Sequence, residues 1–279
     1  MPVFDTPKPI FATLELSVGH TTVTAGDRAD TVVEVRPTDE TNDRDVKFAK
    51  QTRIEYSNGA LLVKTPNPIG LFTKHGSVDV TIELPAGSGI QGRIAVGEFR
   101  STGDLGDTRI TTAMGHILID SATEPHLKTA GGDITMHRAV GTTQITTSTG
   151  GIRVTEIDGS AVIKNSNGTT EIGLVTGNVT VNAANGDIAV GSAQADVDLK
   201  SANGSVRVGE VIRGSTELRT ALGTLEIGIR AGTAAKLDVS TAAGRVHNAL
   251  TPSDGPSSSD ETVEVRARTS FGDIVIRRS

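Results

Sequence analysis

Glycine recurs at a fixed interval through the middle of this 279-residue chain, and no other feature constrains the fold as strongly. One column of glycines has a spacing of 18 residues with a final step of 19, and it comprises Gly132, Gly150, Gly168, Gly186, Gly204 and Gly223. A second column of small residues lies about midway between these positions. A fixed period of this length is typical of repeat architectures, in which each repeat is one supersecondary unit stacked on its neighbours.

The apolar residues between the glycines decide whether the repeat is helical or extended. Apolar positions alternate after each glycine, as at Ile188 and Val190, and two further apolar columns pass through Val175 and Val181. An alternation with period two indicates β-strands. The sequence therefore predicts an all-β fold, a single-chain parallel β-solenoid (β-helix) with coils of about 18 residues.

Asparagine precedes the glycine in three successive repeats. These positions form a candidate structural ladder that comprises Asn167, Asn185, Asn203, Gly168, Gly186 and Gly204. Asn and Gly tolerate positive φ, and stacked amides can hydrogen-bond from one coil to the next. The alternative is a row of ligand-binding amides along one edge, and we favour the structural ladder.

The repeat does not cover the whole chain. Residues 1–85 contain strand-like segments at irregular spacing, with Asn42 to Lys50 as either a short helix or a charged loop. We expect this region to form an N-terminal β cap, because an unprotected first coil would expose an edge. Residues 86–279 are expected to form the solenoid repeats, with a mobile polar loop at 252–261.

The repeat motif returns close to the C-terminus, at Gly272 to Ile276. This position predicts that the last strand lies at the exposed end of the stack, followed by Arg277 and Arg278. Paired arginines beside an edge strand oppose a symmetric contact. We therefore expect a monomer, or weak self-association through the solenoid ends.

Composition and motifs exclude several kinds of chemistry. A net charge of -6 gives no basic stripe for nucleic acid, and no apolar stretch is long enough for membrane insertion. The absence of cysteine excludes thiol catalysis, disulfides and thiolate metal ligands. We expect no catalytic residues, no cofactor and no metal. His116 and Asp133 follow glycines one coil apart, so a metal or acid–base pair at these two residues is conceivable, but we do not predict it.

Two known types of β-repeat site are also rejected. The Gly-Gly-x-Gly-x-Asp repeat of calcium-binding β-rolls never occurs in full. Pectin-lyase-like enzymes carry long catalytic loops, and the chain has none between Gly132 and Gly232. The first ten residues are polar and proline-punctuated, without a basic region and an apolar run, so we expect a cytoplasmic protein, with the cell surface as the alternative.

Several motifs resemble a β-strand-repeat family of unknown function known by the name "putative adhesin". The similar segments are Phe4 to Ile10, Ser77 to Pro85, Asn185 to Val190, Asn203 to Val208 and Arg268 to Ile276. The resemblance implies a solenoid without an assigned activity and without a catalytic motif. More distantly, the short aliphatic coils are similar in kind to those of bactofilins, which polymerise end to end.

These observations favour a non-enzymatic β-solenoid scaffold or interaction module with unidentified protein partners. A surface adhesin and a bactofilin-like polymer are the alternatives. A carbohydrate-active β-helix enzyme is the interpretation that we favour least.

Overall fold

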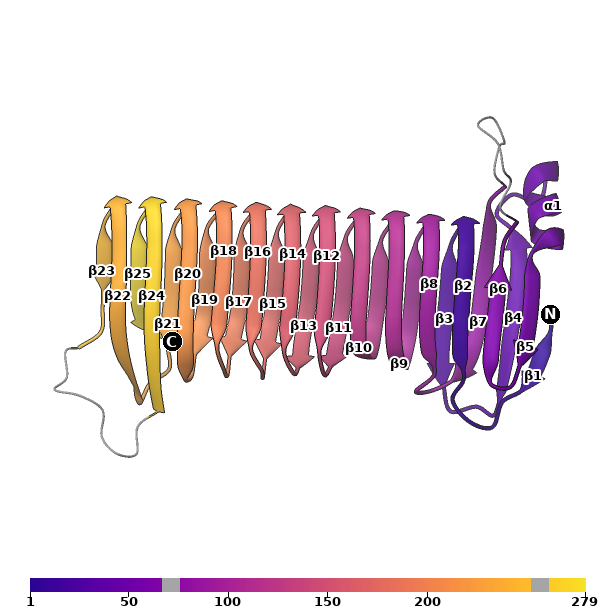
Figure 1. Cartoon of the computed structure of the whole chain (residues 1–279), viewed down its shortest axis with the longest axis horizontal. Helices are drawn as coiled ribbons and strands as arrows, with labels where there is room; N and C mark the ends of the chain where they lie inside the picture. The colour runs from indigo at the N-terminus through magenta and orange to yellow at the C-terminus, as the bar shows by residue number, and fades with distance from the viewer. Residues whose placement is uncertain (67–75, 252–260) are drawn as a thin grey trace. The chain divides into compact units, whose positions relative to one another are not determined.

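A computed structural model describes residues 1–66, 76–251 and 261–279 of the chain. It confirms the all-β fold, because neighbouring coils pair through parallel strands as a β-solenoid requires (Figure 1). The loop expected at 252–261 lies outside the described residues except for Glu261, which begins a strand.

The chain divides into two compact units, residues 1–137 and residues 138–279. The division falls inside strand β11, Ile134–Val140. The boundary expected after Pro85 stays a prediction. Earlier and later strands pair across it, Phe11–Val18 with Gly89–Val96 and Thr21–Gly26 with Phe99–Met114.

The first unit contains the only helix of the described chain and strands of very different lengths. In chain order these elements are β1 (Val3–Asp5), β2 (Phe11–Val18), β3 (Thr21–Gly26), β4 (Asp30–Pro37), α1 (Asp43–Gln51), β5 (Arg53–Ser57), β6 (Ala60–Lys64), β7 (Val78–Pro85), β8 (Gly89–Val96), β9 (Phe99–Met114) and β10 (Ile117–Gly131).

The first coil of this unit, β2 with β3, does not lie at its end. Strand β2 pairs in parallel with both β6 and β8, and β3 pairs in parallel with both β7 and β9. The chain therefore builds an inner coil first, then an outer one, and then returns to the inner side. The region expected as an irregular cap thus contributes a regular coil of its own.

The outer side of this unit is closed by antiparallel strands and the helix. Strand β5 pairs antiparallel with β6, β4 pairs antiparallel with β7, and β1 pairs antiparallel with β4. The stretch expected as a short helix or a charged loop is helix α1, with Asn42 as its N-cap. Its buried Asp45 accepts a hydrogen bond from the backbone N–H of Ser77 at 2.9 Å, which ties the helix to the segment that leads into β7.

The second unit consists of short strands that alternate between two parallel sheets. After β11 these are β12 (Thr143–Thr149), β13 (Ile152–Asp158), β14 (Ala161–Asn167), β15 (Thr170–Val175), β16 (Val179–Asn185), β17 (Ile188–Ala193), β18 (Val197–Asn203), β19 (Val206–Val211), β20 (Gly214–Leu222), β21 (Leu225–Ile229), β22 (Thr233–Ala243), β23 (Val246–Asn248), β24 (Glu261–Phe271) and β25 (Ile274–Arg278).

The core of this unit is made of the apolar columns read from the sequence. Val181 on β16 pairs in register with Ile163 on β14 and Leu199 on β18, and all three side chains are fully buried. Each side chain therefore packs against the coil before it and the coil after it. A single coil buries too little apolar surface to offset the backbone entropy of ~1–2 kcal/mol for each ordered residue, so stacking supplies the stability.

The order of the last coils in space differs from their order in the sequence. Strand β24 pairs with both β20 and β22, and β25 pairs with both β21 and β23 (Figure 1). The last coil of the chain is therefore the penultimate coil of the stack. The prediction that Phe271 to Ile276 forms the exposed end is wrong, because β24 and β25 are paired on both sides. The outermost coil is β22 with β23, which we call the terminal coil.

Candidate functional site

The corner glycines are required by close approach of the backbone. In the second unit, Gly168, Gly186 and Gly204 have φ values of 139°, 139° and 148°. A Cβ atom on Gly186 would lie 2.1 Å from the carbonyl oxygen of Gly168 in the coil before it. Only glycine fits both constraints, so this column is structural.

The three candidate asparagines lie beside these glycines on the exposed edge of the coils. Asn185 Nδ2 donates to Asn167 Oδ1 at 2.9 Å, and Asn203 Nδ2 donates to Asn185 Oδ1 at 2.8 Å. Asn167 Nδ2 in turn donates to the carbonyl oxygen of Ser148 at 3.3 Å. Amide groups that are bonded to each other in this way stabilise the stack and have less capacity left for a ligand.

A second polar ladder runs inside the coils, three residues before the corner glycines. Thr220 Oγ1 donates to the carbonyl oxygen of Gly204 at 2.8 Å, and Ser201 Oγ donates to that of Gly186 at 3.2 Å. Sequence reasoning missed this column, although its signal is a polar residue three positions before glycine. The hydroxyls satisfy corner carbonyl groups that the sheets leave without a strand partner.

His116 and Asp133 belong to a recurring corner contact. The backbone N–H of Asp133 donates to His116 Nδ1 at 3.1 Å. The equivalent contact in another coil is Asp187 Oδ1, which accepts from the backbone N–H of Ser205 at 2.7 Å. Ser205 Oγ and Asp273 Oδ1 make the same kind of contact with the backbone N–H groups of Thr224 and Arg245. A side chain after a corner glycine thus accepts from the N–H of the neighbouring coil in several coils, which accounts for the histidine structurally.

No metal site emerges within the part of the chain that the structure describes. Across residues 1–66, 76–251 and 261–279, no three side chains from His, Asp and Glu gather closely enough to hold an ion. In the same residues, no helix has the length and apolar character needed to cross a bilayer.

The outward faces carry ion pairs between neighbouring coils. Arg153 Nε lies 2.8 Å from Glu171 Oε2, and Arg207 Nε lies 3.5 Å from Glu226 Oε2. Arg277 Nε also contacts Glu226, at 3.0 Å from the other carboxylate oxygen. Opposite charges thus pair across neighbouring strands, and Arg277 lies inside the stack and not at its end. The hydrogen bond from Arg153 to Glu171 raises the pKa of the guanidinium above its ordinary value.

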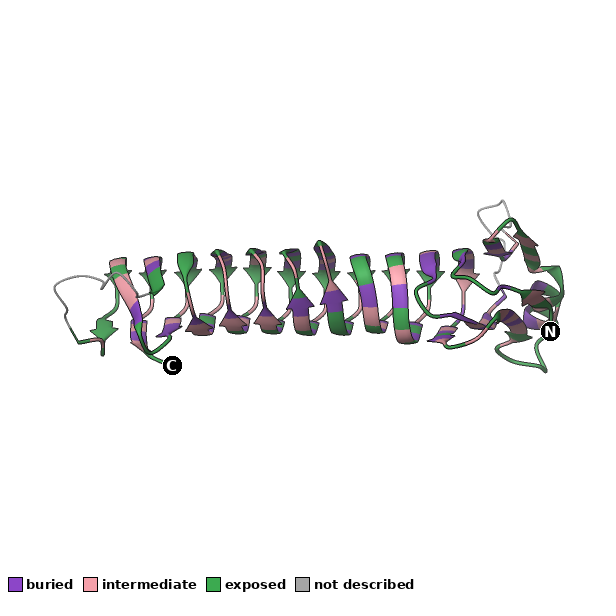
Figure 2. Cartoon of the chain, turned by 90° about the horizontal axis from the view of Figure 1, so that it is seen from below, coloured by how far each residue is buried: buried purple, intermediate pink, exposed green. Residues whose placement is uncertain are grey.

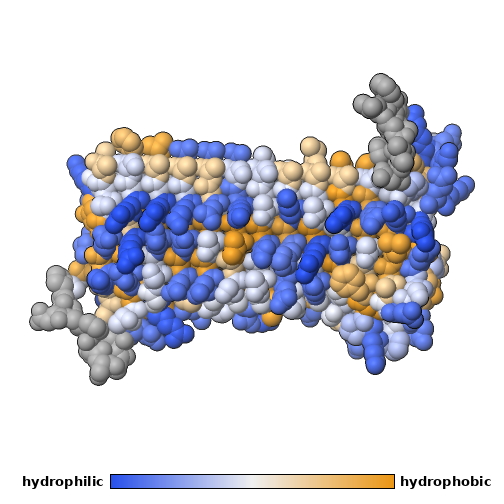
Figure 3. Space-filling model, in the orientation of Figure 1, coloured by the Kyte–Doolittle hydropathy of each residue, from blue (hydrophilic) through white to orange (hydrophobic). Residues whose placement is uncertain are grey.

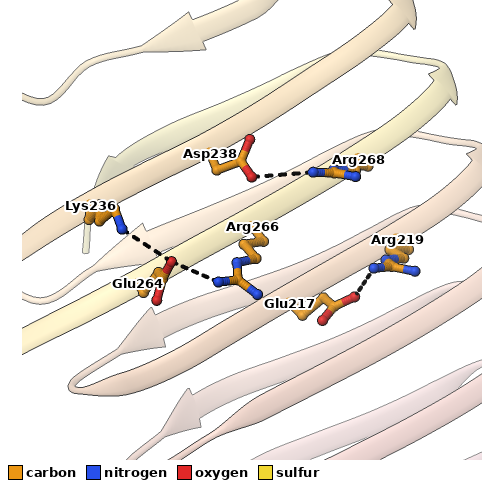
Figure 4. A network of polar contacts seen from close by, with 7 residues as sticks. All are labelled: Glu217, Arg219, Lys236, Asp238, Glu264, Arg266 and Arg268. Carbon is orange, nitrogen blue, oxygen red and sulfur yellow. Dashed lines mark hydrogen bonds and ion pairs between the residues drawn. The ribbon is translucent and has the colours of Figure 1, made fainter.

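Charge is concentrated on the sheet formed by β18, β20, β24 and β22. We call this surface the charged face, and its residues near the terminal coil are Glu217, Arg219, Lys236, Asp238, Glu264, Arg266 and Arg268 (Figure 4). Figure 3 shows strongly hydrophilic side chains in rows across this side of the molecule. Six of these residues line a shallow surface hollow of about 450 Å³.

The cations on the charged face are stacked one above another. Strand register places Lys200 opposite Arg219, and Arg219 opposite Arg268. Neighbouring strands lie ~4.8 Å apart, so like charges in one column repel each other. We call Lys200, Arg219 and Arg268 the basic row, and all three side chains reach solvent.

Each cation of the basic row also has an acidic contact. Lys200 Nζ lies 2.8 Å from Asp198 Oδ2 on its own strand, and Arg219 Nη2 contacts Glu217 on its own strand. Arg268 Nη2 lies 3.3 Å from Asp238 Oδ2 on β22. Exposed pairs of this kind contribute ~0–1 kcal/mol, so the cations keep much of their capacity to interact with other anions.

Glu264 on β24 contacts one cation on its own strand and one on the outermost strand, β22. It accepts from Arg266 Nη2 at 3.0 Å and lies 3.5 Å from Lys236 Nζ. The hydrogen bond and the charge of Arg266, followed by the charge of Lys236, hold the pKa of Glu264 below its ordinary value.

Solved structures that match this chain have low sequence identity and low TM-scores. A "putative adhesin" from Bacteroides fragilis is 10% identical, with coverage of 99% of this chain and 95% of the other at a TM-score of 0.29. A "putative cell adhesion protein" from Clostridium sporogenes is 12% identical, with coverage of 100% and 98% at a TM-score of 0.22. A "putative adhesin" from Parabacteroides distasonis is 14% identical, with coverage of 98% and 95% at a TM-score of 0.29.

Curated protein sequences give no match to this chain. The profile of one protein family matches residues 13–277, which is nearly the whole sequence and both units. The description of this family names no enzymatic activity. The chain belongs to the Toastrack DUF4097 family.

Proposed function

We propose that the protein is a non-enzymatic scaffold that binds an acidic, extended segment of a partner protein along the charged face. The observation that carries this proposal is the basic row, in which Lys200, Arg219 and Arg268 follow one another in register over three strands. Like charges stacked at ~4.8 Å repel each other, and the exposed acidic contacts of these cations offset that repulsion only weakly. A chain of carboxylates laid across the strands would relieve that repulsion.

The rest of the molecule supports a scaffold more than an enzyme. The asparagine ladder, the internal hydroxyls and the corner contacts are used to join one coil to the next. Exposed charges such as those of the charged face raise the rate of association with a partner and favour partners of opposite charge. The interaction is therefore expected to weaken as salt rises, because exposed charges are screened over ~8–10 Å at physiological ionic strength.

The proposal is tested by affinity capture from the source cells with three forms of the protein. These are the natural chain, a variant in which Lys200, Arg219 and Arg268 are all replaced by glutamine, and a control in which Arg153 and Arg207 on the other sheet are replaced by glutamine. We expect a partner that the natural chain and the control retain and the first variant loses. Retention of the same proteins by all three forms contradicts the proposal.

A cytoplasmic location is part of this proposal, and the cell surface is its competitor. Fractionation of the source cells, together with labelling of intact cells by an impermeant reagent, separates the two. Labelling of the protein on intact cells would contradict the cytoplasmic location and favour an adhesin.

A further inference from the structure

The terminal coil has a free edge within the described chain. Strand β22 pairs only with β24, and β23 pairs only with β25, so one side of each strand has no described partner strand. The pairing of β22 is long, and it contains no proline over Thr233–Ala243. Soluble proteins normally shorten, bend or cover such an edge, because it can accept another strand.

The apolar core extends to this edge. Val246 is 44% exposed, whereas Ile274 and Leu225, which precede it in the same column, are fully buried. Leu237 is half-buried, although Val265 beneath it is fully buried. Figure 2 shows the same change from buried to exposed at the terminal coil. A hollow of about 1090 Å³ opens beside Leu237 and is also lined by Leu250.

The side chains of β22 are complementary to a second copy of the same strand. Leu237 faces the core, whereas Lys236 and Asp238 on either side of it are exposed on the charged face. In an antiparallel pair centred on Leu237, the two leucines are opposite each other. Each Lys236 then faces an Asp238, so opposite charges meet twice. On the core side, Ala235 faces Val239.

Other registers lack this match. A shift of one residue would place the apolar face of one strand on the charged face of the other. A slip of two residues in one direction places Lys236 against Lys236, and a slip in the other direction places Asp238 against Asp238. The charges and the apolar positions of β22 therefore both select the register centred on Leu237.

From this self-complementarity we infer that the free edge of β22 binds β22 of a second copy of this chain, in a symmetric dimer. The two-fold axis passes through the pair of Leu237 residues, and the contact closes at two copies. The two sheets become one, and Leu237 and Val246 are removed from water in both copies. This inference concerns the purified chain alone, so it stands or falls independently of the acidic partner proposed above.

The first test reverses the charges on the edge. Sedimentation of the full chain over a range of concentrations is expected to show a monomer–dimer equilibrium. Lys236→Asp and Asp238→Lys should each raise the dimer Kd by about tenfold or more, because two attractive pairs become repulsive. The double variant with both changes should restore dimerisation, and Lys164→Asp on β14 should leave it unchanged.

The second test measures the register. The chain has no cysteine, so Leu237→Cys introduces a single thiol. Opposite Cα atoms in an antiparallel pair lie ~4.5–5.5 Å apart, within the span of a disulfide. Mild oxidation should therefore link two copies of the Leu237→Cys variant rapidly. An Ala234→Cys control places its thiol ~20 Å from the same position in the second copy, at ~3.3 Å per residue, and should remain unlinked.

Several outcomes would overturn the inference. These are a monomer at every concentration, a dimer that both single reversals leave intact, an open series of larger assemblies, and equal crosslinking of the two cysteine variants. Circular dichroism of each variant ensures that a lost dimer reflects a changed edge and not an unfolded chain.

Discussion

Each unit has one outer coil, formed by β6 and β7 in the first unit and by β22 and β23 in the second. The two outer coils share a strand order but differ in what covers them. In the first unit, β2 and β3 lie between an outer coil and the rest of the stack, as β24 and β25 do in the second unit. In both cases an outer coil is connected to the stack through a coil distant from it in sequence.

The two ends differ in what covers the outer coil. In the first unit, antiparallel strands β4 and β5 pair with the outer coil, and α1 is tied to it through Asp45. In the second unit, no described strand pairs with the outer side of β22. Antiparallel strands and a helix cover the outer coil and prevent another parallel coil from stacking on it. An outer coil without them exposes backbone N–H and C=O groups to which another strand can pair. Among the described residues, the outer coil of the first unit is therefore covered, whereas the outer side of the terminal coil has no partner strand.

The largest expected effect compares an interior coil with the terminal coil. Val181 and Val239 belong to one column, but Val181 is fully buried and Val239 is half-buried. Val181→Asp should lower the free energy of unfolding by ~3–5 kcal/mol, because it buries an unpaired charge between two coils. Val239→Asp should cost ~1 kcal/mol, because its carboxylate can still reach water. Equal urea midpoints for the two variants would contradict the open terminal coil.

The next prediction compares two glycines with positive φ, only one of which lies too close to another backbone to accept a Cβ atom. Gly186→Ala should cost ~2–4 kcal/mol, because positive φ and the nearby carbonyl oxygen of Gly168 both oppose a Cβ. Gly232, at the entrance to the terminal coil, has a φ of 87°, but a Cβ atom on it would meet nothing within 4 Å among the described residues. Gly232→Ala should therefore cost only ~1 kcal/mol. Thermal melts of the two variants measure the difference.

The repeat itself was predictable because the main buried apolar columns recur in the sequence at the coil period. Strand β2 begins and ends with the alternation of apolar residues over Phe11–Val18. Strand β3, Thr21–Gly26, contains few apolar residues, so no apolar alternation marks it, and it forms through pairing with β7 and β9. Pairing with distant strands, and not the local sequence pattern, therefore determines where β3 forms.

The exchange of the last two coils was not predicted, although one residue carries the signal. In the core column that contains Ile227 and Ile276, β23 has Asn248. A polar residue there is tolerated at the open end but would be costly between two coils. The chain therefore places β25 inside and β23 outside. The period alone could not show this, because Gly244 and Gly272 follow the preceding glycine at 21 and 28 residues, outside the 18-residue spacing.

A smaller effect is expected from loosening the closed end of the first unit. Asp45→Ala removes the acceptor for the N–H of Ser77 and should lower the free energy of unfolding by ~1–3 kcal/mol, since that N–H loses its side-chain partner. Asp43→Ala, in the same helical turn but exposed, should cost less than ~1 kcal/mol. Hydrogen exchange of α1 and β7 should rise in the first variant only. Unchanged exchange would show that the helix does not protect this end.

The smallest effect concerns pH at the open end. Because the folded chain holds the pKa of Glu264 below its ordinary value, the ionised carboxylate contributes stability at pH values above that ordinary value. This contribution is lost as the pH falls through the lowered pKa, so it disappears only in acid. Arg266→Gln should remove most of the pKa depression and Lys236→Gln a smaller part, in the order of their influence on Glu264. Titration of Glu264 by NMR measures both, and a larger effect of Lys236→Gln would mean that the edge strand, and not β24, controls this carboxylate.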